Sequence, residues 1–91
     1  MNTYILDGRK LYDKKSVHAY IAGLLQFPKW YGNNLDALHD NLCEIGTDTT
    51  VCFINTDTAR KALNEYFDAL TEVFNDCSAE NPHLTVNYDS L

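Results

Sequence analysis

The fold is constrained most by a short apolar run that lies between segments with helical periodicity. The run TVCFI, residues 50–54, is rich in β-branched residues and is flanked by threonine and aspartate. This pattern is typical of a strand at the centre of a sheet or buried on both faces. Two further β-rich segments, TYILD (3–7) and LTVNY (84–88), lie near the ends of the chain. Helical stretches separate the three, which favours an α/β domain with a small parallel sheet and right-handed crossovers.

Two of the helical stretches have recognisable ends. The first begins after Asp13, a residue type that caps helices, and should end near Gln26 because Pro28 disfavours helical geometry in the residue before it. The longest stretch covers about residues 57–79 and is ended by Asn81 and Pro82. Its periodicity does not distinguish one helix from two abutting helices.

Length and composition indicate a single globular domain over residues 1–91, with 45% hydrophobic and 22% charged residues. The sequence has neither a signal-peptide-like apolar segment nor a membrane-spanning run, so we expect a cytoplasmic protein. Cys43, Cys52 and Cys77 lack CxxC spacing. We therefore expect free, buried thiols rather than a disulfide framework or a zinc site.

The net charge of −6 is unevenly distributed along the chain. Residues 1–29 hold five basic and two acidic residues, whereas residues 30–91 hold two basic and eleven acidic residues. Nucleic-acid phosphates are bound by clustered lysine and arginine, so this distribution argues against a nucleic-acid partner. It favours a cationic partner.

A short helix is predicted to begin within WYGNNLDALHDNL, residues 30–42, and to end near Cys43 or Glu44. It places Asp36 and Asp40 one turn apart, where like charges cost an isolated helix about 0.2–0.5 kcal/mol. At helical spacing the leucines form a buried stripe, and the two carboxylates face outward. The helix dipole can account for Asp36, but Asp40, further along, gains little from it.

The loop before this helix carries two aromatic residues, Trp30 and Tyr31. Gly32 gives the loop flexibility, and Asn33 or Asn34 is the expected N-cap. Two aromatic residues beside an outward-facing acidic pair are more typical of a binding surface than of an ordinary solvent-exposed surface.

Catalysis is the less favoured alternative. Asp36, His39 and Asp40 could form an acid–base group, and His18, His39 and His83 could suggest a metal. However, His39 has no nearby nucleophile, there is no glycine-rich phosphate loop, and the histidines lack ligand spacing such as HExxH. We therefore expect no enzymatic activity, no cofactor and no metal. His18 is expected to be exposed or half-buried on its helix, and His83 to lie in a loop or at a strand edge.

The stretch FPKWYGNNLDALHDNL, residues 27–42, resembles the loop and second helix of the barstar family, intracellular inhibitors of the bacterial ribonuclease barnase. The shared run is YG-x-NLDAL-x-D, and a weaker resemblance continues through LTEVFNDCSAE and LTV, residues 70–86. The resemblance implies a two-layer fold in which a three-stranded parallel sheet packs against three or four helices. It also implies that the second helix and its loop plug the active site of a small basic ribonuclease in a 1:1 complex, with carboxylates imitating substrate phosphate. The free inhibitor is expected to be a monomer.

The resemblance further implies roles for individual residues. The family's central aspartate corresponds to Asp40, its partner one turn earlier to Asp36, and a supporting glutamate near the end of the last helix to Asp76. The implied partner-binding set is Trp30, Tyr31, Gly32, Asn33, Asn34, Asp36, His39, Asp40, Asp76 and Glu80.

Three of these positions depart from the family pattern. Trp30 replaces a loop tyrosine, His39 replaces a helix tryptophan, and Asp76 is one methylene shorter than the glutamate. These changes suggest a ribonuclease other than barnase, or a partner of another kind. The alternative function is therefore a barstar-like immunity or interaction module for a different basic toxin or regulatory protein.

Overall fold

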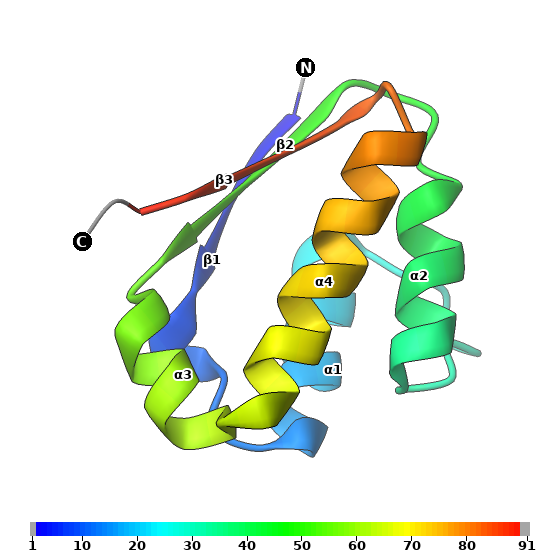
Figure 1. Ribbon diagram of the computed structural model, residues 1–91. Coiled ribbons are helices and arrows are strands. Elements are labelled where there is room, and N and C mark those ends of the chain that lie inside the picture. Colours follow the sequence, from blue (N-terminus) through cyan, green and yellow to red (C-terminus); the bar gives the residue numbers. More distant parts are fainter. Residues whose placement is uncertain (1, 90–91) are drawn as a thin grey trace.

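Three parallel strands form one sheet in the part of the chain that the computed structural model describes, residues 2–89 (Figure 1). The strands are β1 (Asn2–Asp7), β2 (Thr49–Ile54) and β3 (Leu84–Tyr88), and β2 lies between the other two. The helical elements are η1 (Gly8–Lys10), a 3-10 turn, and the helices α1 (Lys14–Leu25), α2 (Leu35–Cys43), α3 (Thr56–Leu63) and α4 (Glu65–Glu80). The predicted α/β fold with a three-stranded parallel sheet is confirmed.

The run that predicted a central strand is β2. From Thr49 onward every second residue of β2 is buried, and the residues between them are half-buried. Val51 pairs with Tyr4 of β1 on one side and with Val86 of β3 on the other. The helices pack on one face of the sheet (Figure 1), while Ile5 on the opposite face is 51% exposed. The protein therefore has two layers.

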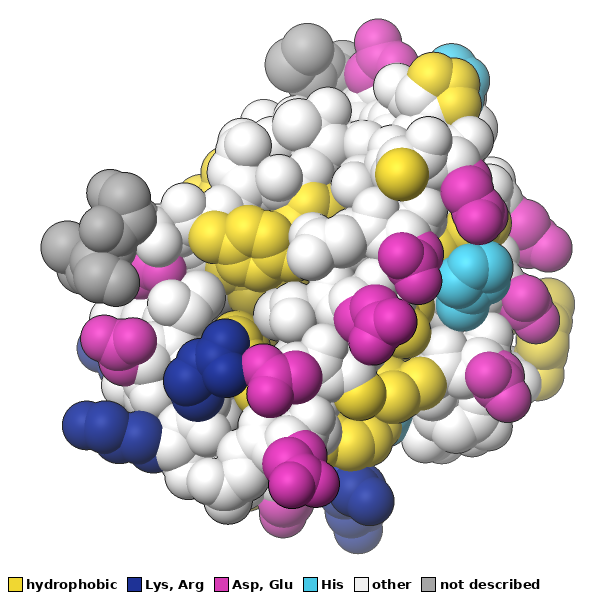
Figure 2. All heavy atoms as spheres, in the orientation of Figure 1, with side chains coloured by type: hydrophobic (Ala, Val, Ile, Leu, Met, Phe, Trp, Pro, Cys, Tyr) yellow, Lys and Arg dark blue, Asp and Glu magenta, His cyan; other side chains and the backbone are white. Residues whose placement is uncertain are grey.

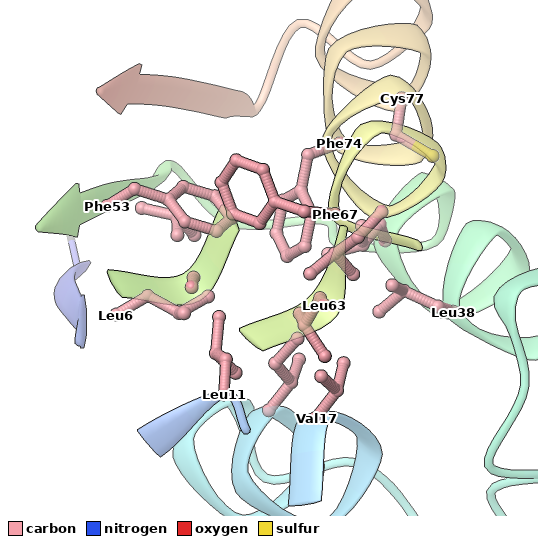
Figure 3. Packing of buried hydrophobic residues seen from close by; sticks show 14 of the residues in the cluster. Leu6, Leu11, Val17, Leu38, Phe53, Leu63, Phe67, Phe74 and Cys77 are labelled. Atoms are coloured by element: carbon pink, nitrogen blue, oxygen red, sulfur yellow. The ribbon is translucent and has the colours of Figure 1, made fainter. Parts of the chain in front are cut away.

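The core lies between the covered face of the sheet and the helices. Phe53 of β2 meets Phe74 of α4 edge to face, with ring centroids 5.0 Å apart and an interplanar angle of 87°, an arrangement that aromatic pairs prefer. Figure 3 shows Val17 of α1, Leu63 of α3 and Leu38 of α2 in the same cluster. Buried side chains from the sheet and from all four helices thus form one contiguous core.

The ends of α1 follow the sequence signals. The Asp13 carboxylate accepts a hydrogen bond from the Ser16 backbone N–H, and the Ser16 hydroxyl interacts with the Asp13 backbone N–H in return, which completes a capping box. Gln26 ends the helix in a left-handed conformation, two residues before Pro28. Within the described residues, no helix has both the length and the apolar character needed to cross a membrane.

The N-terminus of α3 is capped by a residue from the far end of the chain. Asn55 precedes α3 in a left-handed conformation and makes no side-chain cap of its own. Instead, the Asp89 carboxylate accepts hydrogen bonds from the Asn55 backbone N–H at 2.8 Å and from the Thr56 hydroxyl at 2.7 Å. A carboxylate at a helix N-terminus is also favoured by the helix dipole. Asp89, the residue after β3, thereby joins the end of this strand to the start of α3.

The longest helical stretch of the sequence forms two helices in the structure. Its periodicity is compatible with either one helix or two. α3 ends at Leu63 and α4 begins at Glu65. Asn64 between them has φ 53° and ψ −123°, which lies outside the regions that residues with a Cβ normally adopt. Helical geometry therefore breaks at this single residue although the apolar spacing continues across it.

Replacing Asn64 with glycine should stabilise the protein by about 1 kcal/mol. A residue with a Cβ in such a conformation costs about 1–3 kcal/mol, and the greater flexibility of unfolded glycine offsets about 0.5–1 kcal/mol of the relief. Urea denaturation of Asn64→Gly would measure the change. Asn41→Gly, inside α2, is the matched control and should be destabilising. Lower stability of Asn64→Gly would show that the break is not strained.

Candidate functional site

The helix with the acidic pair, α2, is positioned by its N-cap and by α4. The Asn34 carboxamide oxygen accepts a hydrogen bond from the Ala37 backbone N–H at 2.8 Å, and the Asn34 amide donates to the Gly32 carbonyl at 3.2 Å. This identifies Asn34 as the N-cap, one of the two predicted candidates. Leu38 and Leu42 are completely buried, and α2 packs alongside α4 (Figure 1). The side of α2 away from this contact faces solvent.

The two carboxylates of α2 lie on that solvent-facing side, as predicted. Asp36 is exposed in the first turn, and the side chain of Asp40 is 79% exposed. Asp76 and Glu80, near the end of α4, are exposed as well. Figure 2 shows acidic side chains gathered over the face that α2 and α4 form together. The structure thus brings acidic residues from two distant parts of the sequence onto one face.

His39 lies between an acidic residue of α2 and an acidic residue of α4. Its Nδ1 atom lies 3.9 Å from Asp40 Oδ1, and its Nε2 atom lies 3.9 Å from Glu80 Oε2. These separations are too long for hydrogen bonds but bring a protonated imidazole within attraction of both carboxylates. With its side chain 40% exposed, His39 is open to solvent and to a partner.

The loop before α2 presents one aromatic side chain rather than the two that the sequence predicts. Trp30 is 85% exposed, whereas Tyr31 is only 7% exposed. The ring of Tyr31 lies 5.0 Å from that of Phe27, and its hydroxyl is 2.7 Å from Nδ1 of His18. Burial raises the pKa of Tyr31 to about 12. Tyr31 points inward because His18 in the core offers its hydroxyl a hydrogen-bond partner. Its buried ring therefore holds the loop against the core.

The prediction of an exposed or half-buried His18 is wrong. His18 is 2% exposed and lies between two tyrosine hydroxyls, with Nδ1 2.7 Å from Tyr31 and Nε2 2.7 Å from Tyr66 of α4. It therefore connects α1, the loop before α2, and α4. Its spacing from Ile21 and Leu25 places it on the apolar stripe of α1. This spacing could have predicted that His18 is buried, but histidine is polar and is therefore expected at the surface. His83, by contrast, is exposed in the turn before β3, as expected.

Stability should fall as the pH drops below about 6.5 because of His18. Burial holds the pKa of His18 below its usual value, whereas in the unfolded chain it takes up a proton near pH 6.5. Below that pH the unfolded state binds more protons than the folded state. Stability is therefore lost, by up to about 1.4 kcal/mol per pH unit, until the pH reaches the folded-state pKa. Above the unfolded-state pKa this contribution is constant.

Urea denaturation at pH 7.5 and pH 5.5 would measure this loss. His18→Gln should show a smaller loss over that interval than the parent. The Arg9 side chain holds the pKa of Asp7 well below its usual range, so Asp7 does not titrate in this interval. Equal losses in the parent and in His18→Gln would contradict the assignment.

Asn81 has a role that the sequence did not reveal. It is 6% exposed, and its amide donates to the carbonyls of Leu42 and Ile45, each at 3.0 Å, and to that of Cys43 at 3.4 Å. Its carboxamide oxygen accepts a hydrogen bond from the His83 backbone N–H at 2.9 Å. The sequence predicted only that Asn81 ends the last helix. The structure shows that it also satisfies the carbonyls at the end of α2 and so joins α2, α4 and the start of β3.

All three cysteines are free, as predicted. The prediction that the thiols are buried is confirmed for Cys77 but is wrong for Cys43 and Cys52, which are half-buried. Burial raises the pKa of Cys77 to about 12, and the neighbouring Cys43 adds to this effect. The Sγ atoms of Cys43 and Cys77 are only 3.1 Å apart. No sequence pattern indicates this proximity, because the two residues are on different helices.

Comparison with known proteins identifies the class to which this fold and surface belong. The model of the family described as Barstar (barnase inhibitor) matches residues 1–89. The chain therefore belongs to the barstar family. It is also similar to "Putative ribonuclease inhibitor YrdF" of Bacillus subtilis (strain 168), with 32% identity over 81 residues, which cover 88% of this chain and 89% of that protein.

Proposed function

We propose that this protein inhibits a small basic ribonuclease by placing α2 and the preceding loop in the enzyme's active site in a 1:1 complex. The proposal depends above all on Asp40, whose outward carboxylate is 79% exposed on a helix anchored to α4. Membership of the barstar family and the name of the relative from Bacillus subtilis support the same function.

The chemistry of such an active site suits this surface. A ribonuclease binds phosphate with cationic side chains, and fixed carboxylates can make charge-assisted hydrogen bonds to the same groups. Because a carboxylate carries no scissile phosphodiester bond, it blocks the site without being consumed. Acidic charge over α2 and α4 would also accelerate encounter with a cationic enzyme. The protein itself needs no catalytic activity for this function.

The surface that we propose contacts the enzyme consists of the loop, α2 and the end of α4. Trp30 would supply a large aromatic contact, which is a frequent source of binding energy at interfaces. Tyr31 would position the loop rather than contact the enzyme, since its ring is buried. The remaining members of the contact surface are Gly32, Asn33, Asn34, Asp36, His39, Asp40, Asp76 and Glu80.

Inhibition assays with guanyl-specific ribonucleases would test this proposal. The protein should abolish RNA cleavage at stoichiometric concentration, and the double variant Asp36→Asn, Asp40→Asn should lose most of this inhibition. Asp57→Asn, which removes one exposed charge from α3, should inhibit like the parent. Full inhibition by the double variant would overturn the proposal.

A second candidate function is immunity against a different basic toxin or regulation of a basic protein. It is favoured by the exposed Trp30 and by His39, both of which differ from the family pattern at the centre of the proposed contact surface. In a pull-down from the native organism, a protein captured by the parent and lost with the double variant would be this partner. A tight complex that leaves RNA cleavage intact would favour the second function. Either function is proposed for the cytoplasm, where the thiols would stay reduced.

A further inference from the structure

We propose that α2 and α4 together form a binding site for one zinc ion, with His39, Cys43, Cys77 and Glu80 as ligands. His39 and Cys43 are four residues apart on α2, and Cys77 and Glu80 are three residues apart on α4. Residues at these spacings share one helical face. The packing of the two helices brings the two faces together.

The distances among three of these residues suit zinc. The ligand atoms of His39, Cys43 and Cys77 all lie within 4.8 Å of one another. Bonds of about 2.3 Å to sulfur and about 2.0–2.1 Å to nitrogen place tetrahedral ligand atoms about 3.6–3.8 Å apart. The Cys43 sulfur lies 3.8 Å from each ring nitrogen of His39. The two sulfurs are 3.1 Å apart, so binding requires them to separate by about 0.7 Å.

Glu80 completes a four-ligand set. Its Oε2 atom lies 3.7 Å from the Cys43 sulfur and 3.9 Å from His39 Nε2. The Glu80 side chain is 65% exposed and can therefore adjust to an ion with little disturbance of the core. Two sulfur ligands with one nitrogen and one oxygen favour zinc over magnesium or calcium, which prefer oxygen ligands alone.

An ion could reach this site from solvent. His39 and Glu80 are partly exposed, Cys43 is half-buried, and Cys77 forms the buried base of the site. Zinc would displace the thiol protons of both cysteines into solvent, and its charge of +2 would compensate the two thiolates. The exposed Glu80 carboxylate would then leave the site with one net negative charge. This proposal departs from the expectation of no metal. That expectation considered spacing along the chain, whereas these ligands converge only through helix packing.

The alternative to a zinc site is a disulfide bond between Cys43 and Cys77. The observed separation of 3.1 Å exceeds the bonded S–S distance of about 2.05 Å. A disulfide also gives no role to the imidazole of His39 and the carboxylate of Glu80, which lie 3.8 Å and 3.7 Å from the Cys43 sulfur. The convergence of four donors of different chemistry therefore favours the metal.

Zinc titration of the full-length chain under reducing conditions would test the proposal. We expect one zinc ion per chain, higher thermal stability on binding, and, with cobalt as a probe, the absorption of tetrahedral thiolate coordination. Cys43→Ser should weaken zinc binding by at least ~100-fold because it removes an anionic ligand. Cys52→Ser is the matched control, since it alters a half-buried cysteine in β2 outside the site, and it should bind zinc like the parent.

Further variants separate loss of the site from loss of the fold. Cys77→Ser places a hydroxyl at a buried position and should lower stability, whereas His39→Ala changes a half-exposed residue. Both variants should weaken zinc binding, and circular dichroism would verify that they fold. The proposal is overturned if the reduced parent binds no zinc, or binds it no more tightly than Cys43→Ser. It is also overturned if the purified protein holds a Cys43–Cys77 disulfide that persists in excess zinc and glutathione. None of these measurements involves a ribonuclease, so the zinc site can fail without affecting the proposed inhibition.

Discussion

Asp40→Ala is expected to weaken binding to the cognate ribonuclease by at least ~30-fold, which corresponds to about 2 kcal/mol. The Asp40 carboxylate is 79% exposed, and its nearest ionic neighbour, His39, lies 3.9 Å away. Removing the carboxylate therefore costs the free protein little. It also relieves repulsion from Asp36, worth about 0.2–0.5 kcal/mol. A loss of affinity would then report the contact with the enzyme rather than damage to the fold.

Affinity should be measured by calorimetry or by inhibition of RNA cleavage at several salt concentrations. Asp57→Ala removes the same charge from α3 and serves as the control, with little change expected in affinity and a small reduction in the association rate. The prediction depends on the proposed function. Unchanged affinity of Asp40→Ala for the enzyme would show that α2 does not enter the active site.

Asn81→Asp is expected to destabilise the protein by about 3 kcal/mol or more. The Asn81 amide donates to the carbonyls of Leu42 and Ile45 at 3.0 Å, in a position where the residue is 6% exposed. A carboxylate has the same shape but cannot donate, so the carbonyls at the end of α2 lose their partner and face a buried negative charge. The molecules that do fold should also bind the enzyme more weakly, because the end of α2 is no longer held to α4.

Urea denaturation of the parent and of Asn81→Asp at pH 7 and pH 4.5 would measure this effect. Burial should raise the pKa of the introduced carboxyl, so the stability difference from the parent should be larger at pH 7 than at pH 4.5. Asn87→Asp makes the same chemical change at an exposed position of β3 and should alter stability by no more than about 0.5 kcal/mol. A similarly small effect at Asn81 would mean that the interhelical hydrogen bonds contribute little.

The sequence predicted features that depend on local chemistry. Apolar and β-branched runs identified the three strands, and LTVNY matches the bounds of β3, Leu84–Tyr88. Capping residues such as Asp13 and Asn34 marked the starts of α1 and α2. Helical spacing also showed that Asp36 and Asp40 face outward, since orientation on a short helix follows from the positions of its leucines.

Features that depend on packing between distant segments were not predicted. The inward turn of Tyr31 follows from the buried imidazole of His18, which lies 13 positions away in the sequence. The proximity of Cys43 and Cys77 arises only when α2 packs on α4. The break at Asn64 interrupts a stripe whose spacing is continuous, so periodicity contains no information about it. In the first two cases the deciding contact joins residues that no local pattern relates.

The contact between Asp89 and the start of α3 has a practical consequence for attaching the protein to a surface or to another module. Asp89 follows the edge strand β3 and is fastened by its carboxylate to Asn55 and Thr56. In Figure 1 the end of β3 lies at the left of the view, and α2 lies at the right, across the molecule from it. A linker joined beyond Asp89 would therefore leave from a fixed anchor point and keep α2 directed toward solution.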